Sequence, residues 1–116
     1  MIVQKPAGWT LDELRERLAP ALSCGGVLRA VVFGSYARGA ADGFSDLDLA
    51  VVLRTSAPRF ERQHLLDDVY KAVPLGLDLL VLTPEEFEAG TRDRIGIFDA
   101  IVREGVTIYE RARDAT

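Results

Sequence analysis

The sequence predicts a single domain of the α/β class, covering residues 1–116, in which a small β-sheet is flanked by helices. Apolar, strand-like runs alternate with segments of helical spacing along the chain, which is typical of an α/β sandwich. The chain is 48% hydrophobic and 28% charged, so it can bury a core and does not have the composition of a disordered segment. Its 116 residues suit one domain.

The first predicted helix covers residues 11–22. Thr10 and Glu13 have the spacing of a capping box, in which each side chain accepts a hydrogen bond from the backbone amide of the other residue. Pro20 lies inside the segment and is expected to disturb it, because proline lacks a backbone donor. Gly25 is expected to end the helix.

Four apolar runs bounded by turn residues predict β-strands. They cover residues 27–33, 46–53, 77–82 and 106–109. Between the first two runs, residues 36–39 are expected to begin a short helix and residues 40–44 to form a loop around Asp42-Gly43.

Two further helices are predicted between the second and third strands and after the third. Residues 60–73 carry apolar side chains at the spacing of one helical face. Thr83, Pro84 and Glu86 combine an N-cap, a proline at the first helical position and a capping-box acid. A helix is therefore expected to begin there and to run to about residue 89.

The last predicted helix covers residues 93–103 and is stopped by Gly105. It carries an apolar stripe formed by Ile95, Phe98, Ile101 and Val102. Such a stripe is more often core than interface, but in so small a domain part of it could serve a partner.

Charge and composition argue against several classes of function. The formal net charge is −4, whereas broad nucleic-acid binding needs a basic surface that neutralises phosphates. The single cysteine, Cys24, excludes an intrachain disulfide. Residues 1–9 lack the apolar region of a signal peptide, and no apolar run approaches the roughly 18 residues of a membrane span. We therefore expect a cytoplasmic protein with no direct nucleic-acid or membrane partner.

Three aspartates stand at positions that suggest one site. Asp46 and Asp48 fall within the second apolar run, although aspartate is depleted in strands and seldom buried without a partner. Because side chains alternate along a strand, the two carboxylates share a face, with Cα atoms about 6.6 Å apart. Asp78 begins the next run, so all three acids can converge if the two strands are neighbours. The alternative is that Asp46 caps a loop and Asp48 pairs with Arg38.

Converging carboxylates need a neutralising partner. Two unit charges 4 Å apart repel by roughly 4 kcal/mol at an effective dielectric of about 20. Oxygen-only ligands favour Mg²⁺ or Mn²⁺, and two such ions about 3.5–4 Å apart can hold the attacking and leaving oxygens of a phosphoryl transfer. Asp46, Asp48 and Asp78 are therefore candidate metal ligands.

The turn after the first strand is a candidate phosphate cradle. Gly34 lets a phosphate approach the backbone, Ser35 adds a hydroxyl donor, and a helix that began here would offer unpaired amides. A nucleoside triphosphate could bridge this turn and metal ions on the acids, whereas the alternative is an ordinary strand-to-helix turn. Arg38 either faces the triphosphate or locks the turn by pairing with a nearby acid or carbonyl.

Together these residues resemble the nucleotidyltransferase superfamily that includes DNA polymerase β. Its signature is Gly-Ser, ten residues, Asp-x-Asp and a third acid on a later strand, and it is matched here by Gly34-Ser35, Asp46-Leu47-Asp48 and Asp78. The segments GSYARG and SDLDLAVV are similar to those of small prokaryotic members. The chain is identified as a minimal nucleotidyltransferase (MNT), which implies a polymerase-β-like fold with a small mixed sheet flanked by helices.

The resemblance also implies a reaction and a partner. MNT proteins are commonly paired with a separate helical HEPN protein, a toxin ribonuclease, and the implied antitoxin activity transfers AMP from ATP to a tyrosine hydroxyl of that toxin. In the implied roles, Asp46 and Asp48 bind two Mg²⁺ or Mn²⁺ ions, and Asp78 binds the ion nearer the incoming hydroxyl and helps to activate it. Gly34 and Ser35 hold the β- and γ-phosphates. Attack at the α-phosphorus releases pyrophosphate.

Two other functions stay open. The acceptor could be a small molecule, with self-association supplying a missing wall of its site, so that the protein acts as a homo-oligomer rather than a hetero-oligomer. Alternatively, the chain could neutralise its partner by contact alone, with an unused nucleotide site. The complete set of acids and the intact Gly34-Ser35 turn favour transfer, because a decayed site is expected to lose some of them.

Overall fold

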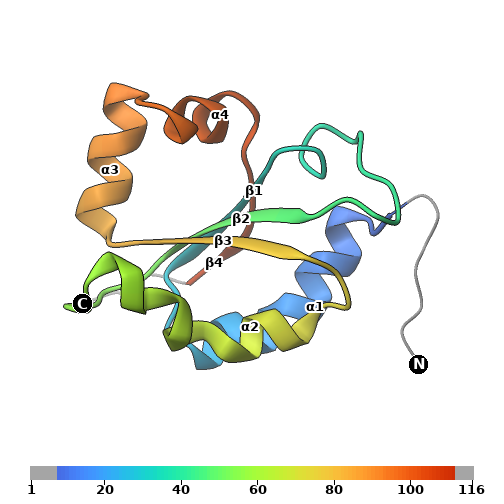
Figure 1. Cartoon of the computed structure of the whole chain (residues 1–116), viewed down its shortest axis with the longest axis horizontal. Coiled ribbons are helices and arrows are strands. Elements are labelled where there is room, and N and C mark those ends of the chain that lie inside the picture. Colours follow the sequence, from blue (N-terminus) through green and yellow to red (C-terminus); the bar gives the residue numbers. More distant parts are fainter. Residues whose placement is uncertain (1–7, 112–116) are drawn as a thin grey trace.

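The protein folds as three layers in which a four-stranded mixed sheet lies between two pairs of helices (Figure 1). The structure is a computed structural model and describes residues 8–111, so most of the N-terminal segment used to predict localisation lies outside the described residues. The helical elements are α1 (Leu11–Cys24), the 3-10 helix η1 (Arg59–Leu66), α2 (Asp67–Ala72), α3 (Pro84–Asp93) and α4 (Ile97–Glu104). Between residues 8 and 111, no helix combines the length and the apolarity that crossing a membrane requires. The predicted α/β sandwich is confirmed.

The sheet has the strand order β3-β2-β1-β4. Its strands are β1 (Arg29–Phe33), β2 (Leu47–Val52), β3 (Leu77–Leu82) and β4 (Val106–Glu110). Strand β1 is antiparallel to both β2 and β4, whereas β2 and β3 are parallel. Strands β1 and β2 are therefore central, and β3 forms an edge.

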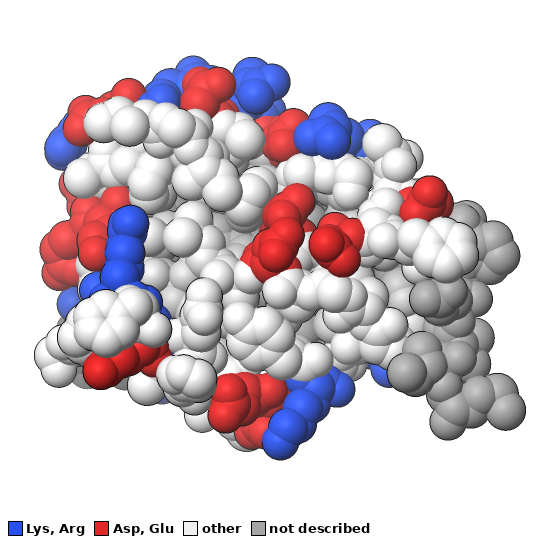
Figure 2. Space-filling view, viewed as in Figure 1, with Lys and Arg blue, Asp and Glu red and all other residues white. Residues whose placement is uncertain are grey.

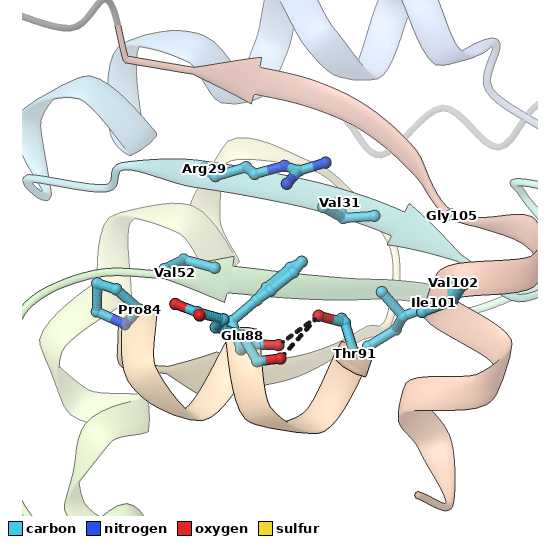
Figure 3. Close-up of a pocket in the computed structure, with 10 residues that line it drawn as sticks. Arg29, Val31, Val52, Pro84, Glu88, Thr91, Ile101, Val102 and Gly105 are labelled. Atoms are coloured by element: carbon cyan, nitrogen blue, oxygen red, sulfur yellow. Dashed lines mark hydrogen bonds between the residues drawn. The ribbon is translucent and has the colours of Figure 1, made fainter. Parts of the chain in front are cut away.

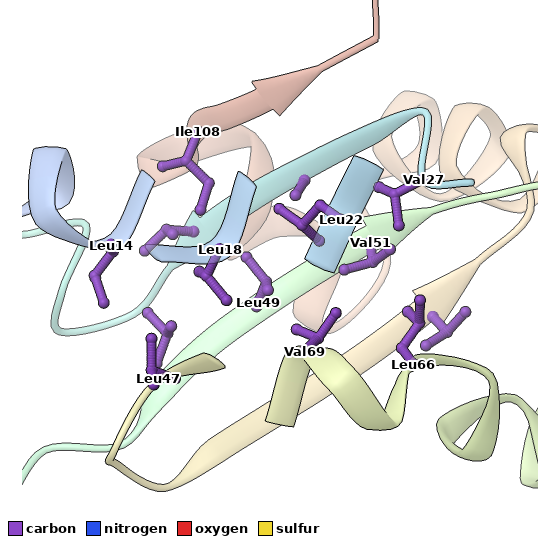
Figure 4. Packing of buried hydrophobic residues seen from close by; sticks show 14 of the residues in the cluster. Leu14, Leu18, Leu22, Val27, Leu47, Leu49, Val51, Leu66, Val69 and Ile108 are labelled. Carbon is purple, nitrogen blue, oxygen red and sulfur yellow. The ribbon is translucent and has the colours of Figure 1, made fainter. Parts of the chain in front are cut away.

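The larger part of the core lies between the sheet and the helices α1 and α2 (Figure 4). Helix α1 contributes leucines that lie four residues apart on one of its faces, and β2 contributes every second side chain. The residues concerned are Leu14, Leu18, Leu22, Leu47, Leu49 and Val51. Burying each such side chain stabilises the fold by about 1.5–3 kcal/mol. A second cluster lies on the opposite face, under α3 and α4, and includes Ala50 and Val52. Strand alternation therefore places Asp48 on this second face.

Both predicted capping boxes are present. The amide of Glu13 donates to Thr10 Oγ1 and the amide of Thr10 donates to Glu13 Oε1, at 3.1 and 3.0 Å. Thr83 and Glu86 make the same reciprocal pair at the start of α3. Helix α1 continues two residues beyond the predicted end, through Pro20, because this proline lies on the exposed side while the flanking leucines pack into the core.

Three further predicted helices are wrong in their extent, one of them because α3 runs to Asp93 rather than to about residue 89. Residues 60–73 do not form one α-helix, since the 3-10 helix η1 ends where Leu66 leaves helical geometry and α2 follows it. The predicted helix over 93–103 starts too early: α3 runs to Asp93, and the chain reverses at Arg94, which has a φ of 54°. The reversal lets Phe98 of α4 lie on Gly90 of α3, where a Cβ atom would overlap the ring. Of the predicted apolar stripe, Ile101 is buried, whereas Ile95 and Val102 are exposed.

A buried ion pair joins η1 to α3. The side chain of Arg62 is only 9% exposed; it donates to the carbonyls of Ala57 and Val81, at 2.9 and 3.3 Å, and to the carboxylate of Glu86. Burial by itself would raise the pKa of Glu86, but the hydrogen bonds from Arg62 and Thr83 outweigh it and lower that pKa. The ionised carboxylate therefore stabilises the folded state.

Leu49→Ala is expected to lower the free energy of unfolding by about 2–5 kcal/mol, because a fully buried side chain leaves a cavity that cannot collapse completely. The matched control is Leu65→Ala, at a position that is 47% exposed, where we expect a change of about 0.5 kcal/mol or less. Urea unfolding measures both. Equal losses would contradict the assignment of Leu49 to the core.

The free energy of unfolding is expected to fall more steeply on acidification in wild-type protein than in the variant Glu86→Gln. Folding lowers the pKa of Glu86, so its contribution is complete above the ordinary glutamate pKa and is lost as the pH falls through the lowered value. Urea unfolding from neutral pH into the acid range measures the slope. Glu61→Gln, on the exposed surface of η1, controls for the loss of one carboxylate. If Glu86→Gln showed the same dependence of the free energy of unfolding on pH as wild type, the lowered pKa of Glu86 would not contribute to stability.

Candidate active site

The parallel pairing of β2 and β3 brings two of the predicted site residues together. Asp48 is the register partner of Asp78, and both side chains line the same cavity, where the charge of Asp78 contributes to raising the pKa of Asp48. Asp46 precedes β2 and is exposed. Its carboxylate lies against Gly76, where a Cβ atom would overlap Oδ1. The strands are therefore neighbours, as the prediction required, and Asp48 and Asp78 are in contact.

The three acids influence one another electrostatically. Burial, then the charge and hydrogen bond of Asp78, and then the charge of Asp46 raise the pKa of Asp48, while Arg38 opposes them. Like charges side by side disfavour the ionised form of a carboxyl group. The arrangement is that of an anionic site that a positive charge would relieve.

A cavity of about 380 Å³ opens beside the acid pair, at the edge of the sheet formed by β3. Besides Asp48 and Asp78, its lining is uncharged and is made by Phe33, Gln63, Tyr70, Leu77, Leu79, Leu80 and Ile97. Burial and the charges of Asp67 and Asp78 raise the pKa of Tyr70. Figure 2 shows the same character at the surface, with acidic atoms in the middle of a broad uncharged area.

The acid pair has the donor chemistry of a divalent-cation site. All of its ligand atoms are carboxylate oxygens, which Mg²⁺ and Mn²⁺ prefer, and a cation would relieve the crowding of charge that raises the pKa of Asp48. Within the described part of the chain, no three histidine, cysteine or acidic side chains gather closely enough to hold a metal ion. The structure thus assembles Asp48 and Asp78, whereas Asp46 stands apart and reaches Asp48 only through its charge.

The predicted helix at residues 36–39 is wrong, and the chain forms hydrogen-bonded turns instead. The amides of Arg38 and Ala40 donate to the carbonyls of Gly34 and Ser35, at 3.1 and 2.9 Å. Gly39, with a φ of 72°, then reverses the chain before a second helical turn forms. The amides of residues 35–37 donate to no other described residue, so this single turn keeps the unpaired donors of a helix start.

Gly34 fits closely between this turn and the acid pair. Its φ is 76°, and a Cβ atom at this position would overlap Asp48 Oδ2. Glycine is required for both reasons, because other residues rarely adopt this φ and would collide with the carboxylate. The candidate phosphate turn therefore lies directly against one of the candidate metal ligands.

A residue that the sequence prediction missed holds this turn from the other side. Glu104 Oε1 accepts a hydrogen bond from the amide of Gly34 at 3.0 Å, and its two oxygens accept from Arg38 Nη1 at 3.1 and 3.2 Å. The bond from Gly34 is the main cause that lowers the pKa of Glu104, and Arg38 adds to it. A signal existed: Glu104 ends helix α4, where the helix dipole disfavours an acid, so a tertiary partner was to be expected. Arg38 pairs with Glu104 in this structure, and its contact with a triphosphate stays a prediction.

Another cavity lies away from the acids, between the sheet and the helices α3 and α4 (Figure 3). Its volume is about 590 Å³, and no predicted site residue lines it. The guanidinium of Arg29 stacks over the ring of Phe87, 5.2 Å from its centroid, and donates to Thr107. Because these groups already satisfy one another, this cavity shows no grouping of reactive side chains.

Comparisons with known proteins agree with this geometry. A model of the nucleotidyltransferase domain matches residues 11–108, while a comparison with curated proteins finds no match. Among solved structures, a protein provisionally described as a minimal nucleotidyltransferase is 29% identical, with a TM-score of 0.58. The match covers 84% of this chain and 95% of that one.

Chains of two toxin-antitoxin complexes have a similar fold. One complex was solved with AMP-PNP; its match has a TM-score of 0.61 and 18% identity, over 84% of this chain and 73% of that one. The other is a tri-AMPylated Shewanella oneidensis HEPN toxin in complex with MNT antitoxin; its match has a TM-score of 0.56 and 17% identity, over 88% and 74%. At these identities the likeness shows the fold alone. It confirms the predicted mixed sheet flanked by helices.

Gly34→Ala is expected to destabilise the protein more than Gly39→Ala. Both glycines have a positive φ, which costs alanine about 1–2 kcal/mol. Only Gly34 lies against Asp48, while a Cβ atom at Gly39 would meet open space, so we expect overpacking to add about 1–3 kcal/mol at Gly34. Urea unfolding gives both values. Equal costs would show that the turn does not pack against the acid.

Proposed function

Because the chain belongs to the nucleotidyltransferase domain family, we propose that it is a metal-dependent transferase that moves AMP from ATP to a hydroxyl of a protein partner. The predicted relation to the polymerase-β-like minimal nucleotidyltransferases is confirmed. The observation that carries the proposal is the contact between Asp48 and Asp78 directly beside the Gly34 turn. Such a site combines paired carboxylates with unpaired backbone donors, which is the chemistry that a metal-bound triphosphate needs.

The hydrogen-bond donors of the turn and the carboxylates would bind different parts of the metal-bound triphosphate. The amides of residues 35–37 and the Ser35 hydroxyl would hold the β- and γ-phosphates, as free amides at a helix start do. Asp46, Asp48 and Asp78 would hold Mg²⁺ or Mn²⁺ ions, which when bound neutralise the triphosphate and stabilise the charge of the transition state. The protein then contributes mainly positioning and fixed charge, which suffice for phosphoryl-type transfer.

The order of the elements across the sheet supports a proposal for where the acceptor would enter. The phosphate turn follows β1, Asp48 lies on β2 and Asp78 on the edge strand β3. An acceptor that attacks in line with the departing pyrophosphate would come from the β3 side, where the 380 Å³ cavity opens. Asp78, at this edge, would orient the incoming hydroxyl and take up its proton. The largely apolar lining of the cavity is compatible with an aromatic side chain such as tyrosine.

The proposed partner is a HEPN-type toxin, and the proposed role is that of its antitoxin. Support comes from the similar fold of chains in complexes described as toxin-antitoxin assemblies, one of which contains an AMPylated HEPN toxin. The surface adds a second argument, since the exposed side chain of Ile97 lies at the rim of the acid cavity and Ile95 and Val102 are exposed nearby in sequence. A protein partner that delivered its hydroxyl to Asp78 would cover Ile97.

The double variant Asp46→Asn with Asp48→Asn is expected to abolish transfer, with a loss of at least about 100-fold in rate. The tagged chain is purified with whatever accompanies it, and the intact masses of all chains are recorded before and after addition of ATP with Mg²⁺. With wild-type protein, we expect a partner chain to gain the mass of one or more AMP groups. Asp68→Asn, an exposed acid on α2, is the matched control and is expected to keep full activity.

Three results would count against the proposal. A partner that binds but never gains mass, and that starts unmodified, would indicate neutralisation by contact. Survival of transfer in the double variant would remove the acids from the chemistry. If no protein accompanied the chain, a small-molecule acceptor would replace the protein partner.

A further inference from the structure

Glu104 connects the end of helix α4 to the phosphate turn, and it contacts two residues that the sequence assigned to nucleotide binding. Its carboxylate binds the amide of Gly34 and the guanidinium of Arg38. The side chain is 14% exposed, whereas that of Arg38 is 54% exposed. We propose that Glu104 is a positioning residue, which holds the turn against Asp48 and keeps Arg38 away from the phosphates. The inference rests on the proposed function of the site.

The position of Glu104 is set by the packing of α4 on β1. At Gly105 a Cβ atom would overlap the carbonyl of Ile101 and come within 2.8 Å of Val31 Cγ1. Helix α4 can therefore end this close to the sheet only with glycine there, and its amide caps the helix by donating to Ile101 at 2.9 Å. The preceding residue, Glu104, is thereby brought to the end of β1, where Gly34 follows Phe33.

Only one of the backbone amides in the turn donates to Glu104, and those of residues 35–37 stay available to a ligand. Glu104 takes the amide of Gly34, which is the first of the turn, and leaves the amides of residues 35–37 without a partner among the described residues. Gly34 is thus held on one side by the carboxylate of Glu104 and on the other by close contact with Asp48. A carboxylate that competed with phosphate would accept hydrogen bonds from the amides of residues 35–37. Glu104 instead accepts from the neighbouring amide of Gly34 and leaves those three amides to the phosphate.

The role differs from direct phosphate binding by Arg38. An arginine paired with a carboxylate through both of its oxygens has its charge largely neutralised, so its attraction for a triphosphate is reduced. Removing Glu104 would release both the amide of Gly34 and Arg38. The turn would then lose its fixed position relative to Asp48, and nucleotide affinity would fall even though a negative charge near the phosphates had been removed.

The test measures binding of a non-hydrolysable ATP analogue with Mg²⁺ by isothermal titration calorimetry. We expect Glu104→Ala to weaken binding about tenfold, which corresponds to about 1.4 kcal/mol. Arg38→Ala should weaken it by a similar factor, and the two together no more than either alone, because both changes break the same contact. Glu104→Asp, which keeps the charge, is expected to recover part of the loss. Glu110→Gln, an exposed acid at the end of β4, is expected to bind like wild type.

Amide NMR spectra provide a second readout that a general loss of stability would not mimic. In wild-type protein, we expect the analogue to shift the resonances of residues 35–37 and to leave that of Gly34 nearly unchanged. Glu104→Gln still offers an oxygen to the Gly34 amide and is expected to fold, so it is studied where the alanine variant unfolds. In the Glu104→Gln variant, the Gly34 amide resonance should differ from that of wild-type protein even in the absence of nucleotide.

Each contrary result has a distinct meaning. Tighter binding by Glu104→Ala or Glu104→Gln would make Glu104 an internal competitor of the nucleotide. Unchanged affinity with a lowered melting temperature would leave it a structural contact only. Additive losses of affinity in the double variant would indicate that Arg38 contacts the phosphates directly. If wild-type protein bound no analogue, the proposed function would fail, and the positioning role with it.

Discussion

The contact between Asp48 and Asp78 is the constraint around which the site is arranged. Parallel pairing of β2 with β3 fixes the two carboxylates at one register position, although their charges repel by a few kcal/mol. The fold tolerates this because the alternate residues of β2, Leu47, Leu49 and Val51, are fully buried on the other face. Each of these contributes about 1.5–3 kcal/mol, so the core outweighs the repulsion and holds the two acids side by side.

Two close approaches of glycine define the surroundings of the acids. Gly34 lies against Asp48 and Gly76 against Asp46, and in both places a Cβ atom would overlap the carboxylate. The backbone therefore reaches the acids more closely than any side chain would permit. On the far side of Gly34, the carboxylate of Glu104 holds the amide and pairs with Arg38. The turn thus lies between a candidate metal ligand and the carboxylate of Glu104.

The arrangement separates the two halves of the proposed reaction across the sheet. Amides that have no partner among residues 8–111 follow β1, where a nucleotide would lie in the proposed reaction. The acids on β2 and β3 occupy the middle, and the cavity proposed for the acceptor opens at the β3 edge. Because β3 is an edge strand and the cavity beside the acids is otherwise lined by uncharged residues, a protein could approach the acids without bringing its own charges out of water. A chain of this size can therefore carry the nucleotide site while a partner supplies the acceptor.

The sequence by itself determined the four strands, the starts of two helices and the family. Apolar runs bounded by turn residues predicted the four strands, the two capping boxes predicted the starts of α1 and α3, and the Gly34-Ser35 and Asp46-x-Asp48 spacing indicated the family. These signals are local, since capping and alternation act over a few residues. Only the tertiary structure decided that a single turn replaces the helix at residues 36–39 and that the chain reverses at Arg94. The pairing of Glu104 with Gly34, 70 residues apart, likewise depends on how α4 packs against β1, and no local pattern encodes such a long-range contact.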